Sequence, residues 1–183
     1  MPDNRPAPDP SDHMAPVGPV PEEHLICLGL GSNINPQSNL PLAVQLIRQF
    51  MILEAVSTAW ETPAVGNHGP DFLNAAVLIR TRLSPETLKN QIIRRIEAEL
   101  GRVRTKNKNA PRSIDIDILI VDEQVIEPEI WTHAYLAVPI AELLPNFESK
   151  ESGETIEAAA RRLIKVTSIQ PRPEVLPGPQ AQS

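Results

Sequence analysis

Two aspartates stand two residues apart in the stretch PRSIDIDILI, which spans residues 111–120. Successive side chains of a strand point to opposite faces, so Asp115 and Asp117 share one face while the isoleucines around them share the other. Aspartate is depleted in strands and like charges on one face repel, so this pattern costs stability unless positive charge lies between the carboxylates. The pattern therefore predicts that metal ions or arginine side chains neutralise the pair.

The loop before the aspartates is strongly cationic. Between positions 102 and 112 there is no acidic residue, and the basic residues are Arg102, Arg104, Lys106, Lys108 and Arg112. Carboxylates about 7 Å apart on a strand suit a pair of hard cations such as Mg²⁺, with substrate phosphates supplying further oxygen ligands. An isolated aspartate pair is explained by a solvated strand face, but the neighbouring cations favour a site for phosphoryl transfer.

A second group of residues fits a flat heterocyclic ligand. Phe72 and Asn74 share one face of the segment DFLNAAVLIRT (71–81), which offers an aromatic ring beside an amide that both donates and accepts hydrogen bonds. A place in the core is the alternative for Phe72. The segment GLGSN (29–33) lacks the third glycine of a dinucleotide fingerprint and the GK[ST] of a P-loop, so neither of those phosphate-binding folds is expected.

The expected elements place these residues on one sheet. Strands are expected at about 25–31, 52–60, 71–81 and 114–121. Helices are expected from a cap at Asn39 to Met51, from a cap at Ser84 to Gly101, near 140–144 and at about 154–164, with a hairpin or loop at 122–138. The order βαββαβ is typical of a ferredoxin-like α+β sandwich, in which helices cover one face of an antiparallel sheet. Right-handed crossovers would bring the last strand beside the first, in the middle of the sheet.

Composition bounds the domain and its partners. The chain has 183 residues and a net charge of −6, which argues against a general nucleic-acid binder. One domain is expected at 23–170, between disordered tails at 1–22 and 171–183 that hold seven and four of the 20 prolines. The single cysteine, Cys27, lies in an apolar run and is expected to be buried and inert. No apolar run is long enough to cross a bilayer and no signal peptide is recognisable, so we expect a cytoplasmic protein without a membrane partner.

Taken together, these segments resemble the hydroxymethyl-dihydropterin pyrophosphokinase family. The resemblance covers about residues 25–145 and runs through GSN (31–33), ETPAVG (61–66), DFLNAAV (71–77), ELGRVR (99–104) and PRSIDIDILI (111–120). It implies a magnesium-dependent enzyme of folate biosynthesis. Such an enzyme transfers pyrophosphate from ATP to the hydroxymethyl group of 6-hydroxymethyl-7,8-dihydropterin and releases AMP.

The resemblance also implies roles for individual residues. Asp115 and Asp117 would bind two magnesium ions that bridge the ATP phosphates. Arg102 and Arg112 would steady the transferring pyrophosphoryl group. Nucleotide contacts are implied for Glu97, Arg104, Thr132 and His133. The pterin pocket would be formed by Thr62, Pro63, Phe72 and Asn74.

Two departures from the family pattern bear on loop closure. The family normally has a histidine followed several residues later by an arginine and an aromatic residue, and THAYLAVPIAELLP (132–145) is too short to contain them. We therefore expect that the second wall of the pterin stack and one mobile cation are absent. Asn109 and Ala110 stand where the family often has tryptophan and glycine.

Three alternatives stay open, two because of these departures and the third because of the basic loop. The chain is a noncatalytic pterin- or nucleotide-binding homologue, a pyrophosphokinase for a related and bulkier pterin, or an RNA binder on a ferredoxin-like sheet. The last is disfavoured by an aromatic content of 3% and the negative net charge. A monomer or weak homodimer is expected.

Overall fold

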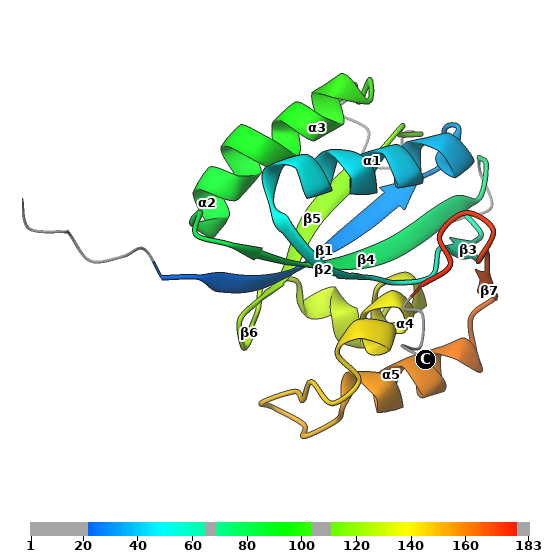
Figure 1. Ribbon diagram of the computed structural model, residues 1–183. Helices are drawn as coiled ribbons and strands as arrows, with labels where there is room; N and C mark the ends of the chain where they lie inside the picture. Colours follow the sequence, from blue (N-terminus) through cyan, green and yellow to red (C-terminus); the bar gives the residue numbers. More distant parts are fainter. Residues whose placement is uncertain (1–21, 65–68, 104–110, 179–183) are drawn as a thin grey trace, which may run out of the picture.

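The computed structural model describes residues 22–64, 69–103 and 111–178 (Figure 1). Its strands form one sheet in the order β6–β5–β1–β4–β3–β7, and β2 also pairs with β4. The strands are β1 (His24–Ser32), β2 (Ile52–Val56), β3 (Trp60–Thr62), β4 (Phe72–Thr81), β5 (Asp115–Val121), β6 (Gln124–Val125) and β7 (Gln170–Pro171). Neighbouring strands are antiparallel, so the expected α+β ferredoxin-like arrangement is confirmed.

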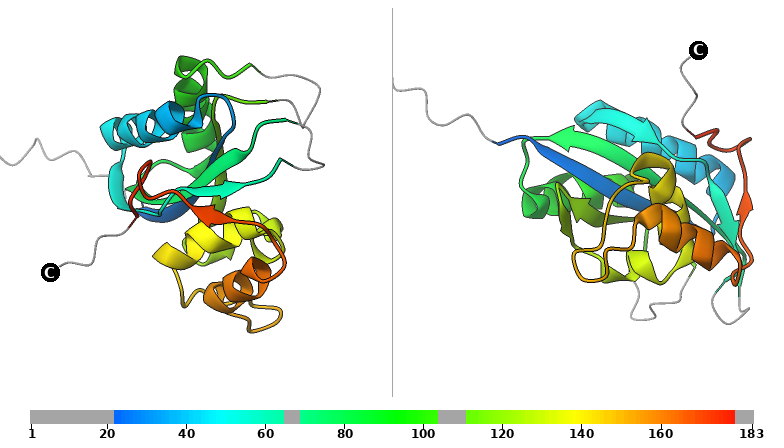
Figure 2. Two further views of the ribbon diagram at one scale, coloured as in Figure 1. Left: turned by 90° about the vertical axis from the view of Figure 1, so that its right-hand side faces the viewer. Right: turned by 90° about the horizontal axis from the view of Figure 1, so that it is seen from below.

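Helices cover both faces of this sheet (Figures 1 and 2). One face carries α1 (Pro36–Phe50) and a segment made of α2 (Pro85–Thr87), η2 (Leu88–Ile93) and α3 (Arg94–Glu99). The other face carries α4 (Ala134–Leu143) and α5 (Ile156–Ile164), with the short η3 (Pro128–Trp131) before them. The expectation of helices on one face was therefore incomplete, because the sheet has an apolar core on each side.

Alternation along β1 divides its side chains between the two cores. Leu28 belongs to the cluster that includes residues of α1 and α3, whereas its neighbour Cys27 belongs to the cluster under α4 and α5. Cys27 is fully enclosed, and burial raises the pKa of its thiol to about 12. The thiol therefore stays protonated at neutral pH, as expected of an inert structural cysteine.

The second expected strand, 52–60, is divided into β2 and β3. The break falls at Ser57 and Thr58. The Ser57 hydroxyl accepts the Ala76 N–H at 2.8 Å, and the Thr58 N–H is taken by the Glu142 carboxylate of α4 at 2.8 Å. Side chains thus replace the regular backbone ladder, which local sequence periodicity does not reveal.

The helix expected at 84–101 contains π-type turns in η2. Its start is as expected, because the Ser84 hydroxyl accepts the Thr87 N–H at 3.2 Å. A π turn adds one residue to the helical repeat, so the buried position moves from Ile92 to Ile93, which is 1% exposed. The regular helix expected from Ser84 to Gly101 is therefore interrupted at this point, and Glu97 is brought to face the sheet with 3% exposure.

Two helices begin earlier than expected. α1 starts at Pro36 after Asn35, and the Asn39 amide instead donates to the Ile34 carbonyl at 2.7 Å. α4 starts directly after His133, so the region expected to be a hairpin or loop at 122–138 ends earlier than expected.

β5 lies beside β1, as right-handed crossovers predict. The prediction that β5 lies in the middle of the sheet was wrong for the end of the strand that carries Asp115. β6 pairs only with Ile120 and Val121, so among the described residues the Asp115 end pairs with β1 alone. The outer edge is covered by side chains instead, because Glu97 accepts the Ile116 N–H at 3.2 Å.

The expected disordered tail at 171–183 is wrong for residues 171–178. Pro171 pairs with Trp60 of β3, and Leu176 is 7% exposed within the core. Val175 and Leu176, which lie between two prolines, are enough to order this segment. The open edge of β3 pairs with its backbone, and the core accommodates Leu176. The expected tail at 1–22 and residues 179–183 lie, but for Glu22, outside the described part of the chain. None of the described helices is long and apolar enough to cross a membrane.

Candidate functional site

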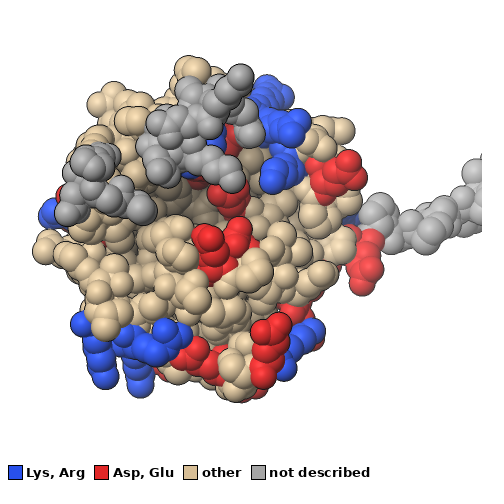
Figure 3. All heavy atoms as spheres, turned by 180° about the vertical axis from the view of Figure 1, so that it is seen from behind, with Lys and Arg blue, Asp and Glu red and all other residues tan. Residues whose placement is uncertain are grey.

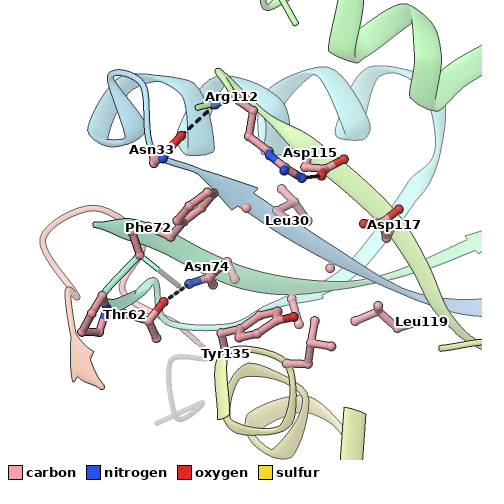
Figure 4. A pocket seen from close by; sticks show the side chains of 17 residues that line it. Leu30, Asn33, Thr62, Phe72, Asn74, Arg112, Asp115, Asp117, Leu119 and Tyr135 are labelled. Atoms are coloured by element: carbon pink, nitrogen blue, oxygen red, sulfur yellow. Dashed lines mark hydrogen bonds and ion pairs between the residues drawn. The ribbon is translucent and has the colours of Figure 1, made fainter. Parts of the chain in front are cut away.

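A cavity of about 290 Å³ opens on the sheet face that also carries α4 (Figure 4). Its walls come from the neighbouring strands β1, β4 and β5, from the end of β3 and from the start of α4. Acidic side chains gather beside a hollow on the face seen in Figure 3. Of the residues predicted for the site, this cavity brings together Thr62, Pro63, Phe72, Asn74, Arg112, Asp115 and Asp117.

Glycines of β1 form the floor between the two predicted groups of residues. Gly31 is paired with Asn74 on one side and with Asp115 on the other, and Gly29 is likewise paired with Asp117. A Cβ at Gly31 would lie 3.4 Å from Asn74 Oδ1, and one at Gly29 would lie 2.9 Å from Leu119 Cδ1. The segment GLGSN, which sequence reasoning treated as a strand end, therefore leaves room for a ligand directly on the sheet.

Asp115 is neutralised by two arginines. Its Oδ1 lies 2.7 Å from Arg102 Nη1, and its Oδ2 accepts a hydrogen bond from Arg112 Nη1. The Arg102 guanidinium is held further by the Ile114 carbonyl at 2.8 Å and lies 3.7 Å from Glu97 Oε1. Of the two partners predicted for the aspartates, arginines are the ones seen at Asp115.

Asp117 is more exposed and carries no hydrogen bond or ion pair within the described ranges. Partial desolvation in the cavity raises the pKa of its carboxyl, and the charge of Asp115 raises it further. The Lys89 and Arg102 charges act in the opposite direction. Asp117 is therefore the carboxylate whose charge is least compensated by the protein, and bound cations would stabilise it.

Arg112 joins the acidic half of the cavity to the aromatic half. Its backbone N–H donates to Asn33 Oδ1 at 2.7 Å, while the N–H groups of Asn33 and Ile34 donate to its carbonyl at 3.1 and 3.2 Å. Its guanidinium carbon lies 5.9 Å from the centroid of the Phe72 ring. Asn33, the last residue of the GSN motif, thus positions the loop that delivers Arg112.

The opposite half of the cavity offers a ring and an oriented amide. Phe72 is half-buried and lines the cavity, so the alternative of a place in the core does not hold. The Asn74 side chain is buried, and its Nδ2 donates to Thr62 Oγ1 at 2.9 Å. This bond fixes the direction of the amide, which prepares it to recognise the edge of a heterocycle.

Tyr135 of α4 supplies a second aromatic side chain to the cavity (Figure 4). Burial raises the pKa of its hydroxyl, and the Glu129 charge adds to the effect. The second wall of the pterin stack, which was expected to be absent, therefore has a candidate in Tyr135. The signal was present in the sequence as an aromatic two residues after His133, but only packing of α4 on the sheet directs it into the cavity.

Three of the predicted nucleotide contacts, Glu97, Thr132 and His133, do not line the cavity. Glu97 is buried behind β5, where it bonds to the Ile116 N–H. Thr132 Oγ1 and His133 Nδ1 lie 3.0 Å apart at the start of α4. Arg104, Asn109 and Ala110 lie outside the described residues. Within the described ranges no three His, Cys, Asp or Glu side chains converge on a possible metal position.

The family model for 7,8-dihydro-6-hydroxymethylpterin-pyrophosphokinase matches residues 27–145. The chain belongs to this family. A pyrophosphokinase named 2-amino-4-hydroxy-6-hydroxymethyldihydropteridine pyrophosphokinase from Synechocystis sp. is 32% identical over 157 residues, which cover 78% of this chain and 80% of the relative. The enzyme of that name from Methylorubrum extorquens is 38% identical over 148 residues, covering 74% of this chain and 91% of the relative.

Solved structures agree on the fold of the pyrophosphokinase family. The Plasmodium falciparum HPPK-DHPS wild type with SDX-DHP aligns with a TM-score of 0.60 and 13% identity, over 78% of this chain and 44% of that chain. The A437G variant with STZ-DHP aligns with a TM-score of 0.65 and 11% identity, over 81% of this chain and 47% of that chain. This chain thus spans less than half of those proteins, and the likeness concerns the fold alone.

Proposed function

We propose that this member of the family carries out pyrophosphoryl transfer at the described cavity, with Asp115 and Asp117 as its magnesium ligands. The reaction moves pyrophosphate from ATP to the hydroxymethyl group of 6-hydroxymethyl-7,8-dihydropterin, in folate biosynthesis. The observation that carries the proposal is the register across β1, which sets Asn74 and Asp115 on either side of Gly31. A bound pterin and the phosphates of ATP would therefore meet on one surface.

The donor set fits magnesium. Carboxylate oxygens are ligands that Mg²⁺ prefers, and this ion usually takes one or two protein carboxylates while water and phosphates complete its octahedron. Two aspartates with no third acidic, His or Cys side chain converging on them in the described part of the chain match that habit. Two bound ions would neutralise phosphate charge and would offset the desolvation that raises the pKa of Asp117.

The residues of the cavity divide the work. Phe72 and Tyr135 offer ring faces to a pterin, and Asn74, oriented by Thr62, offers hydrogen bonds to its edge. Pro63 closes this side of the cavity. The pocket thereby holds the hydroxymethyl oxygen in line with the β-phosphorus of ATP, and positioning of this kind is a large part of catalysis.

Arginines act on the phosphate side. Arg112 lies between Phe72 and Asp115, so its guanidinium stands where the transferring group would pass. Arg102, anchored on Asp115, adds positive charge to the same wall. Both offset the negative charge that develops as AMP leaves. Roles for Glu97, Arg104, Thr132 and His133 toward the nucleotide, a cytoplasmic location and a monomeric or weakly dimeric state stay predictions.

The test is to identify the nucleotide product. The full chain is incubated with ATP, Mg²⁺ and 6-hydroxymethyl-7,8-dihydropterin, and AMP is expected to accumulate in proportion to pterin consumed. Appearance of ADP would refute pyrophosphoryl transfer. Pterin binding without turnover would favour the noncatalytic alternative, and preference for a larger pterin would favour the related-substrate alternative. Reactions with EDTA in place of Mg²⁺ test the metal requirement separately.

A further inference from the structure

Residues 170–178, here called the C-terminal strap, lie beyond the segment 27–145 that the family model matches. The strap is drawn in orange to red in Figure 1 and runs beside β3. Gln170 and Pro171 pair antiparallel with Glu61 and Trp60 of β3. Further along, the Arg172 N–H donates to the Ala59 carbonyl at 2.7 Å. The strap therefore continues the sheet at an edge that would otherwise be open.

Two side chains anchor the strap. Leu176 is 7% exposed and belongs to the same apolar cluster as Leu73 of β4. The Arg172 guanidinium forms an ion pair with the Glu61 carboxylate, in which Arg172 Nε lies 2.8 Å from Glu61 Oε2. The ion pair is partly exposed, so Leu176 is the stronger anchor and Arg172 sets the register.

The segment 58–62 is held from three sides. The strap covers its outer edge and β4 its inner edge, where Trp60 pairs with Asn74. From below, the Glu142 carboxylate of α4 accepts the Thr58 N–H at 2.8 Å and the Trp60 Nε1–H at 2.6 Å. The end of the strap passes over this contact, because a Cβ at Gly178 would overlap Thr58 Oγ1 and lie 3.0 Å from Glu142 Oε2.

This arrangement links the strap to one half of the cavity. The segment 58–62 ends in Thr62, whose hydroxyl receives the Asn74 amide, and Glu142 lies on the helix that carries Tyr135. Asp115 and Asp117 are on the far side of β1 and have no contact with the strap among the described residues. Without the strap, β3 would be a three-residue edge strand, and short unpaired edges fray readily.

We propose that the C-terminal strap is a positioning element for the pterin half of the cavity. It acts through segment 58–62 on the Thr62–Asn74 contact and leaves the phosphate half unchanged. This inference rests on the proposed function, since it assigns the two halves of the cavity to pterin and nucleotide.

The test uses full-length variants and compares two affinities. Arg172→Gln removes the ion pair with Glu61, and Leu176→Ala removes the buried anchor. Arg161→Gln is the matched control, because Arg161 forms a comparable exposed pair with Glu157 within α5, with Nη2–Oε1 at 2.7 Å. Dissociation constants are measured for the pterin and for a nonhydrolysable ATP analogue with Mg²⁺, at a temperature where circular dichroism shows each variant folded.

Arg172→Gln is expected to weaken pterin binding by about two- to five-fold, because loss of the exposed ion pair with Glu61 loosens β3 only moderately. Leu176→Ala is expected to weaken it more, and Arg172→Lys to recover most of the loss. Affinity for the ATP analogue is expected to stay unchanged in all of them, and Arg161→Gln to change neither affinity.

Two results would overturn the inference while the proposed function stands. One is unchanged pterin affinity in both Arg172→Gln and Leu176→Ala. The other is an equal loss for pterin and ATP analogue, which would show a general structural role. If the unaltered chain itself binds no pterin, the proposed function fails and the strap inference fails with it.

Discussion

Asn74 of β4 and Asp115 of β5 lie across Gly31 of β1, one on each side of the same residue. Asn74 precedes Asp115 by 41 positions in the chain, yet their two strands flank one glycine. A ligand resting on Gly31 would touch an amide on one side and a carboxylate held by two arginines on the other. This relationship is the basis of the predictions below.

Asp117→Asn is expected to abolish Mg²⁺-dependent turnover. The substitution keeps the shape of the side chain and removes the charge that a cation would bind, and Asp117 has no ion pair in the described ranges to compensate. The measurement is AMP formation at saturating Mg²⁺. Asp122→Asn is the control and is expected to keep activity. The Asp122 carboxylate does not line the cavity, and its Oδ2 lies 2.9 Å from His24 Nδ1. Unaltered turnover in Asp117→Asn would contradict the metal assignment.

The same substitution is expected to raise stability at neutral pH in the absence of metal. Because the folded-state pKa of Asp117 lies above its ordinary value of 3.8, the folded protein binds this proton more tightly than the unfolded chain does. The contribution of Asp117 to the free energy of unfolding therefore falls as pH rises from 3.8 toward the folded-state pKa. Above the folded-state pKa this contribution is fully lost.

Thermal unfolding of the metal-free protein checks this sign. Asp117→Asn should unfold at a higher temperature than the unaltered chain at pH 7, and the difference should shrink as pH falls toward 3.8. Addition of Mg²⁺ with an ATP analogue should stabilise only the unaltered chain. A variant that is less stable at pH 7 would show that Asp117 makes a structural contact.

Tyr135→Leu is expected to weaken pterin binding by about two- to ten-fold. A stacked aromatic pair contributes ~0.5–1.5 kcal/mol beyond its buried area, and ~1.4 kcal/mol corresponds to a factor of ten in affinity. Tyr135→Phe keeps the ring and should keep the affinity. Isothermal titration with the pterin separates the two, and equal affinities for Leu and Tyr would show that the ring of Tyr135 does not stack.

With two rings in the cavity, Phe72→Ala is expected to weaken pterin binding about as much as Tyr135→Leu does. Had Phe72 been the sole wall, its loss would have cost more than the loss of either ring from a pair. The comparison is made by titrating both variants and the double variant. A far larger effect of Phe72→Ala alone would restore the single-wall interpretation.

Gly31→Ala is expected to weaken pterin binding while the fold is kept. The added methyl group would stand 3.4 Å from Asn74 Oδ1, which the packing tolerates, but it would rise from the floor on which a flat ligand rests. Gly29→Ala differs, because its methyl group would press on Leu119 Cδ1 at 2.9 Å and stability is expected to fall. Both variants are measured for both properties. Pterin affinity should fall more in Gly31→Ala, and the melting temperature should fall more in Gly29→Ala.

Part of this site is local information and can be predicted from the sequence. Strand side chains alternate with a period of two. It follows from their spacing that Asp115 and Asp117 share one strand face, and that Phe72 and Asn74 do so as well. The Ser84 cap and the order of strands and helices are local in the same sense, and they predicted the ferredoxin-like sheet.

Contacts between distant segments were beyond that reach. Which glycine lies between Asn74 and Asp115 depends on the register of three strands, and a shift by one residue would send every side chain to the opposite face. The divided strand at Ser57 and Thr58 arises because side chains, one of them Glu142 of the distant α4, take over backbone hydrogen bonds. Periodicity within one segment contains no trace of those partners.

By itself, then, the sequence determined which chemical groups share a strand face, because backbone geometry sets that alternation wherever a strand forms. Only the tertiary structure decided that Tyr135 enters the cavity from α4 and that the strap at 170–178 holds β3. Both depend on packing between segments far apart in the chain, where apolar burial and the pairing of an open sheet edge outweigh the weak local preferences of these residues.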